Sequence, residues 1–129
     1  MSIATKTKKP TRGISQTATV TTGPGLMQWR KKRGISRKLF ASMADCSERT
    51  LATCEKAAQI PKTIERPVTE TVRLLGGLKE LAGEDDVLKA WLVAPNRAFG
   101  NKTPLSLIES GESDRLWEMV YQLRQKAFA

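Results

Sequence analysis

Histidine is absent from this sequence of 129 residues, and cysteine occurs only twice. Without histidine the protein lacks the residue on which most acid–base catalysis and the Ser-His-Asp type of nucleophile depend. Two cysteines alone cannot supply the four ligands of a structural zinc ion. The sequence therefore argues against an enzyme and against a resident metal or other cofactor.

Long apolar runs are also missing from the sequence. No segment approaches the roughly 20 apolar residues that a membrane-spanning helix needs. The N-terminal stretch is basic and has no apolar core of the kind that a secretory signal has. We therefore expect a cytoplasmic protein without membrane contact, in which Cys46 and Cys54 stay reduced and pack as small apolar side chains.

Positive charge is abundant but unevenly distributed. The net charge of +9 divides into +4 for residues 1–24, +6 for residues 25–66 and −1 for residues 67–129. A basic front part followed by a near-neutral back part indicates a polyanion contact in one and a different task in the other. A solvated surface that serves only solubility is the alternative explanation of the same charge.

The apolar pattern divides the chain in the same way. Residues 1–24 contain no acidic residue and few apolar ones, so we expect a flexible basic arm there. From residue 25 onward apolar residues recur at helical spacing and no segment has the pattern of a strand, which predicts an all-α fold. Pro61 and Pro67 delimit a connector, so we expect separate domains over 25–66 and 67–129.

Three short helices are expected in the first of these domains. Ser36 and Ser47 are good N-cap residues for the second and third helices. Between them, Asp45 tolerates the left-handed backbone conformation that a tight turn requires. Two short helices joined by a tight turn, with a polar outer face on the second, form the helix-turn-helix pattern, so we expect a small helix-turn-helix bundle.

The segment Ile35–Lys56 resembles, without gaps, the Xre-type helix-turn-helix of phage repressors and bacterial regulators. It departs from that family at Asp45, where glycine is commoner. The resemblance implies that Arg49 and its neighbours face base edges, that the start of the preceding helix faces a phosphate, and that Arg30 and Glu55 form an internal salt bridge. The DNA-binding residues implied in this way are Ser36, Arg37, Glu48, Arg49, Thr50 and Thr53.

Four further helices are expected in the second domain, over about 68–82, 87–93, 104–109 and from Asp114 onward. The pair Gly76-Gly77 predicts a kink or a close helix contact. The acidic run Glu84-Asp85-Asp86 suits a helix N-terminus, which explains it better than a metal site does. In the third of these helices we expect Leu105 and Ile108 to face inward. In the last, Leu116, Val120 and Leu123 form one stripe, and Trp117 and Tyr121 form a second.

The segment WLVAPNRAFGNKTPLSLI, residues 91–108, resembles the toxin-binding domain shared by the Xre/MbcA/ParS antitoxins. The resemblance extends over about Val68–Ala129 and departs from the family at the tail, which lacks the usual glycine. It implies a domain that dimerises and binds a RES-domain toxin acting on NAD, with the C-terminal end obstructing the toxin's active site. On this basis we assign toxin binding to Trp117, Tyr121, Arg124, Lys126, Phe128 and Ala129.

Both resemblances together predict an antitoxin of a type II toxin–antitoxin system. It would inhibit a RES-like, NAD-consuming toxin sterically and repress its own operon by binding operator DNA as a homodimer or higher oligomer. The alternative is a free-standing helix-turn-helix transcriptional regulator whose second domain serves only dimerisation. In neither interpretation is the protein an enzyme, and no cofactor is expected.

Overall fold

The computed structural model describes residues 20–127, which form α-helices, a short 3₁₀ helix and no strand. The expected all-α fold is therefore confirmed for this part of the chain. None of its helices is long and apolar enough to cross a membrane. In chain order the elements are α2 (Gly23–Lys32), α3 (Arg37–Met43), α4 (Glu48–Lys56), α5 (Lys62–Ala82), α6 (Asp85–Leu92), η1 (Arg97–Phe99), α7 (Pro104–Glu109) and α8 (Ser113–Ala127).

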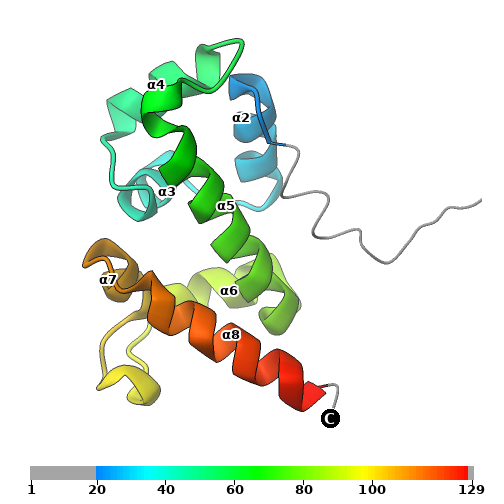
Figure 1. The fold of residues 1–129 in the computed structure, drawn as a ribbon, viewed down its shortest axis with the longest axis vertical. Helices are drawn as coiled ribbons and strands as arrows, with labels where there is room; N and C mark the ends of the chain where they lie inside the picture. Colours follow the sequence, from blue (N-terminus) through cyan, green and yellow to red (C-terminus); the bar gives the residue numbers. More distant parts are fainter. Residues whose placement is uncertain (1–19, 128–129) are drawn as a thin grey trace, which may run out of the picture.

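Helices α2, α3 and α4 form the predicted helix-turn-helix bundle (Figure 1). The side chains of Ser36 and Ser47 cap α3 and α4, each accepting a backbone N–H at 3.0 Å. Asp45 takes the left-handed conformation with φ 57°. Phe40 and Leu51 are fully buried in the centre of the bundle. The local signals in the sequence therefore define this bundle correctly.

The bundle begins earlier than the sequence analysis expected. Helix α2 starts at Gly23, with the side chain of Thr22 as its cap. The N–H of Gly23 donates to the carbonyl of Ala57 at 3.0 Å, which attaches this end to the residue that follows α4. The expectation of a flexible arm was thus wrong for residues 20–24, because Thr22 and Pro24 act as helix-start signals. Residues 1–19 of the expected arm lie outside the described part of the chain.

Helix α5 runs through the expected connector. It begins at Lys62 and contains Pro67, so the prediction of a break between Pro61 and Pro67 was wrong. The apolar stripe already starts at Ile64 and continues through Val68, which explains why the helix includes the proline. Figure 1 shows α5 leading from the helix-turn-helix bundle into the group formed by α6, α7 and α8. The expected domain boundary at residue 67 therefore falls inside a helix.

The second helical group packs around the last turns of α5. Leu107 of α7 and Leu116 and Val120 of α8 are fully buried, whereas Leu123, on the same stripe of α8, is 41% exposed. Leu105 and Ile108, expected to face inward, pack against the core but are only half-buried, because Leu107 takes the central position of α7.

Contacts also join the two groups of helices. The hydroxyl of Ser42 in α3 donates a hydrogen bond to the carboxylate of Glu109 in α7. Lys89 of α6 donates to the carbonyl of Gly34, in the loop between α2 and α3, at 3.2 Å. The buried residues of both groups form one continuous hydrophobic cluster. The two groups therefore meet along α5 and across these polar contacts.

Candidate functional site

The outer face of α4 consists of polar side chains in solvent. Its inner face buries Leu51 and Cys54 against the bundle. Because one face of the helix packs on the bundle, the residues on the opposite face point away from the core. The structure accordingly exposes the four residues of α4 that the sequence analysis selected: Glu48, Arg49, Thr50 and Thr53.

A buried ion pair fixes the orientation of α4 on α2. Arg30 in α2 donates from Nε and Nη2 to the two carboxylate oxygens of Glu55, at 2.7 and 3.0 Å. Nη1 of Arg30 donates to the carbonyl of Ile35 at 3.0 Å. Both side chains are almost fully buried, so the pair implied by the family resemblance is present and structural.

Arg37, at the first position of α3, shares the same carboxylate. Its Nε and Nη2 donate to Oε1 of Glu55 at 3.2 and 3.1 Å, while its side chain remains 40% exposed. Burial raises the pKa of Glu55, but the hydrogen bonds and charges of Arg30 and Arg37 outweigh it and hold this pKa below its usual value. One carboxylate therefore balances two guanidinium groups, which leaves positive charge at the start of α3.

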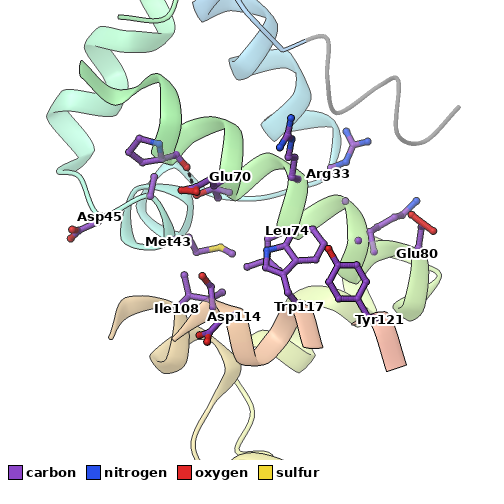
Figure 2. Close-up of a pocket in the computed structure, with 18 of the residues that line it drawn as sticks. Arg33, Met43, Asp45, Glu70, Leu74, Glu80, Ile108, Asp114, Trp117 and Tyr121 are labelled. Carbon is purple, nitrogen blue, oxygen red and sulfur yellow. Dashed lines mark hydrogen bonds between the residues drawn. The ribbon is translucent and has the colours of Figure 1, made fainter. Parts of the chain in front are cut away.

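A groove of about 1040 Å³ lies between α5 and α8 and is bounded at one end by α3 and the turn that follows it. Figure 2 shows Trp117 and Tyr121 side by side on α8, with Leu74 of α5 above them. Met43 and Ala44 at the end of α3 and Ile108 of α7 complete the apolar lining. The groove therefore joins residues that lie far apart in the sequence.

The aromatic pair on α8 is the main feature of this groove. The rings of Trp117 and Tyr121 stack with centroids 5.9 Å apart and planes inclined by 26°. Trp117 lies so close to α5 that a Cβ atom added to Gly77 would be 3.3 Å from its ring, which confirms the close packing predicted for the glycine pair. Tyr121 is 56% exposed. Trp117 is therefore packed against α5 and stacks on the more exposed ring of Tyr121.

The structure brings together three of the six residues to which toxin binding was assigned. Trp117, Tyr121 and Arg124 all line the groove, and Arg124 pairs with Glu80 of α5 at 3.0 Å. Lys126 is exposed on the last turn of α8. Phe128 and Ala129 lie outside the described residues.

The groove residues contributed by α3, α5 and α7 were not identified as site residues from the sequence. The pair Gly76-Gly77 was the one available signal, because it predicted a close approach without naming the partner. Within residues 20–127 there is no cluster of carboxylate or thiol side chains that could hold a metal ion.

The fold and these two surfaces define the class of protein: an all-helical binding protein that combines a helix-turn-helix with a grooved helical domain. Residues 77–123 match the family model of the antitoxin Xre/MbcA/ParS C-terminal toxin-binding domain. These residues are therefore a toxin-binding domain of that antitoxin family, which implies a cognate toxin as partner. No curated protein and no solved structure matches the chain. The matched range begins in α5, contains Trp117 and Tyr121, and ends just before Arg124.

Proposed function

We propose that the protein is the antitoxin of a type II toxin–antitoxin pair. In this proposal it binds a RES-like, NAD-consuming toxin, obstructs the active site of that toxin sterically, and represses its own operon by binding operator DNA. The observation that carries the proposal is the match of residues 77–123 to the toxin-binding domain, together with the stacked pair of a half-buried Trp117 and an exposed Tyr121 that this range places in the groove.

Tyr121 is the residue to which we assign the central toxin contact. Aromatic side chains are enriched among the residues that dominate binding energy at protein interfaces. Tyr121 offers such a side chain at the surface, and Trp117 holds it in place by stacking. The turn that follows it carries Arg124 and Lys126. Their positive charges suit an acidic rim around the cleft in which the toxin binds NAD. We therefore assign these two residues to the rim of the interface and Tyr121 to its centre.

The toxin contact can be tested by replacing Tyr121 with alanine. The loss of a central aromatic residue costs about 2 kcal/mol or more, which corresponds to a roughly 30-fold weaker complex. Leu123→Ala is the matched control, because Leu123 is similarly exposed on the same helix but does not line the groove. The measurements are the dissociation constant of the purified pair and the growth of cells that co-express the toxin.

A chain ending at Gln125 tests the obstruction mechanism separately. It retains Tyr121 and Arg124, so we expect it to keep the fold but protect cells less well than the full chain. Equal protection would refute obstruction by the C-terminal end. If the full chain does not protect cells from the product of the neighbouring gene yet binds operator DNA, the alternative applies, and the protein is a free-standing regulator.

DNA binding by α4 is proposed from its exposed polar face and the surrounding positive charge. A guanidinium group such as that of Arg49 can donate two hydrogen bonds to guanine in the major groove. Arg37 keeps an exposed side chain at the start of α3, where it is available to a phosphate. The exposed lysines Lys31, Lys32 and Lys38 add attraction that does not depend on base sequence.

Arg49→Ala should reduce the preference for operator over scrambled DNA by about 1–3 kcal/mol. Lys102→Ala removes one positive charge from an exposed site remote from α4 and serves as the charge-matched control. Fluorescence anisotropy with both DNA sequences measures the preference. Unchanged discrimination in Arg49→Ala would refute the assignment of α4 as the recognition helix.

A further inference from the structure

The groove extends beyond the toxin-binding domain into the helix-turn-helix bundle. The matched residues 77–123 contribute Trp117 and Tyr121 to its lining. The bundle contributes Arg33, which follows α2, and Asp45, in the turn after α3. Arg33 is half-buried and Asp45 is exposed, so both can be reached from the groove. A partner that fills the groove therefore touches both groups of helices.

The groove is large enough for a segment of a partner protein. Pockets that bury most of a drug-sized ligand have volumes of about 300–1,000 Å³. The volume of about 1040 Å³ is at the top of this range. The central contact that we assign to Tyr121 occupies only part of it. Because Tyr121 and Arg33 line one and the same groove, a toxin segment seated on Tyr121 has room to extend to Arg33.

Trp29 holds the side chain of Arg33 in a fixed position. The guanidinium carbon of Arg33 lies 4.4 Å from the centre of the Trp29 ring, and its Nη1 donates to the carbonyl of Trp29 at 3.3 Å. Trp29 is itself buried and packs edge-on against Phe40, with ring centroids 6.3 Å apart. A side chain that is ordered before binding loses less entropy when a partner arrives. Arg33 is therefore oriented in advance to receive an acceptor group.

Arg33 forms no ion pair within residues 20–127. Burial removes part of its hydration and lowers its pKa, while the charge of Asp85 has a smaller, opposite effect on this pKa. A carboxylate that reaches such a partly dehydrated guanidinium forms strong, charge-assisted hydrogen bonds with it. No residue of α4 lines the groove, so DNA bound to the recognition face does not supply this acceptor.

We propose that the toxin occupies this groove with one of its segments and that a carboxylate of this segment binds Arg33. The helix-turn-helix bundle is then part of the toxin interface, although it lies outside the residues that match the toxin-binding domain. A guanidinium fork suits a carboxylate, because it can donate two parallel hydrogen bonds to the two oxygens. The inference rests on the proposed function, since it concerns the partner of the same groove.

Arg33→Gln removes the charge but keeps a long polar side chain. We expect the dissociation constant of the complex with the toxin to rise about tenfold or more. Arg97→Gln is the matched control, because Arg97 is exposed, forms no ion pair within the described residues and does not line the groove. Isothermal titration calorimetry of the full chain with the purified RES-like toxin measures both, and thermal unfolding shows whether each variant keeps its fold. A folded Arg33→Gln variant that binds the toxin like the wild type would overturn the proposal.

Cross-linking locates the toxin on the groove without relying on affinity. Glu65 and Glu70 are both exposed on α5 and both precede the matched residues, but only Glu70 lines the groove. When each is replaced in turn by the photoreactive p-benzoylphenylalanine, we expect the toxin to be cross-linked from the site of Glu70 and not from that of Glu65. No cross-link from the site of Glu70, or equal cross-linking from both sites, would contradict the proposal.

The outcomes separate this inference from the proposed function. If the wild-type chain binds the toxin and Tyr121→Ala weakens the complex while Arg33→Gln does not, the proposed function stands and the inference is wrong. If the wild-type chain does not bind the toxin, both are wrong. The preference of Arg33→Gln for operator over scrambled DNA, measured by fluorescence anisotropy, should equal that of the wild type. A weaker preference together with unchanged toxin affinity would assign Arg33 to the DNA interface instead.

Discussion

Replacing Glu55 with glutamine removes the charge that two arginines share. The change preserves the shape of the side chain but leaves the guanidinium of Arg30 buried without an opposite charge. Arg37 loses its partner too, although its exposed part can be rehydrated. The structure therefore predicts that most of the cost comes from Arg30.

The magnitude follows from the burial of this pair. Breaking a buried ion pair by removing one partner costs about 3–5 kcal/mol, because the remaining charge is uncompensated. The half-exposed contact with Arg37 adds at most about 1 kcal/mol. We therefore expect Glu55→Gln to lower the free energy of unfolding by about 3–6 kcal/mol. Since a domain is stable by about 5–15 kcal/mol in total, this loss is severe.

Urea denaturation followed by tryptophan fluorescence measures this effect. Trp29 is a suitable reporter, because it is buried beside Phe40 in the same bundle. Glu70→Gln is the control, since its partner Arg66 lies 3.6 Å away and both are exposed, so at most about 1 kcal/mol is at stake. A loss below about 1 kcal/mol in Glu55→Gln would refute the reasoning, because it would mean that Arg30 is not effectively desolvated.

Three further predictions concern the same bundle. The pKa of Glu55 is lower in the folded than in the unfolded protein, so its contribution to stability is present above about pH 4.3 and is lost as the pH falls toward the folded pKa; Glu55→Gln should lack this part of the acid sensitivity in unfolding experiments between about pH 5 and 3. Gly23→Ala should cost about 1–3 kcal/mol in urea denaturation, because its Cβ would lie 2.3 Å from the carbonyl oxygen of Cys54. Ser47→Ala should cost about 1 kcal/mol, because it removes the cap that accepts the N–H of Thr50, and a loss near zero in the same assay would contradict that role.

The helix-turn-helix bundle could be predicted because its determinants are local. Ser36 and Ser47 mark helix starts within a few residues of themselves, and Asp45 marks the turn in the same way. The prediction of a salt bridge between Arg30 and Glu55 came instead from the family resemblance, because their spacing in the sequence does not show that they meet. The participation of Arg37 in that bridge was missed, because one carboxylate can accept from two arginines only where the fold brings both to it.

The groove could be predicted only in part. Trp117 and Tyr121 were identified because the family resemblance places toxin binding on the last helix and because aromatic side chains are enriched at interfaces. Met43 and Leu74 were not identified, because their place in the groove depends on how α3 and α5 pack against α8, and this packing has no local signal. The exposure of Leu123 was missed for a related reason: helical spacing groups Leu116, Val120 and Leu123 on one stripe but does not show how far along that stripe the core extends.

Pro67 offers a test of the continuity of α5, the feature on which sequence and structure differ most. In a helix interior proline is about 3 kcal/mol less favourable than alanine. Alanine also increases the conformational entropy of the unfolded chain, which reduces the expected gain in stability by about 0.4–1 kcal/mol. Because α5 includes Pro67, we expect Pro67→Ala to stabilise the protein by about 2 kcal/mol.

A connector at Pro67 would give the opposite sign. Outside a helix, the main effect of replacing proline is to loosen the unfolded chain, which destabilises the protein by about 0.4–1 kcal/mol. Pro61 precedes α5 and provides this comparison within the same chain, so Pro61→Ala should be destabilising while Pro67→Ala is stabilising. Urea denaturation of both variants decides the matter, since a loss of stability in Pro67→Ala would mean that α5 does not run unbroken from the helix-turn-helix bundle into the toxin-binding domain.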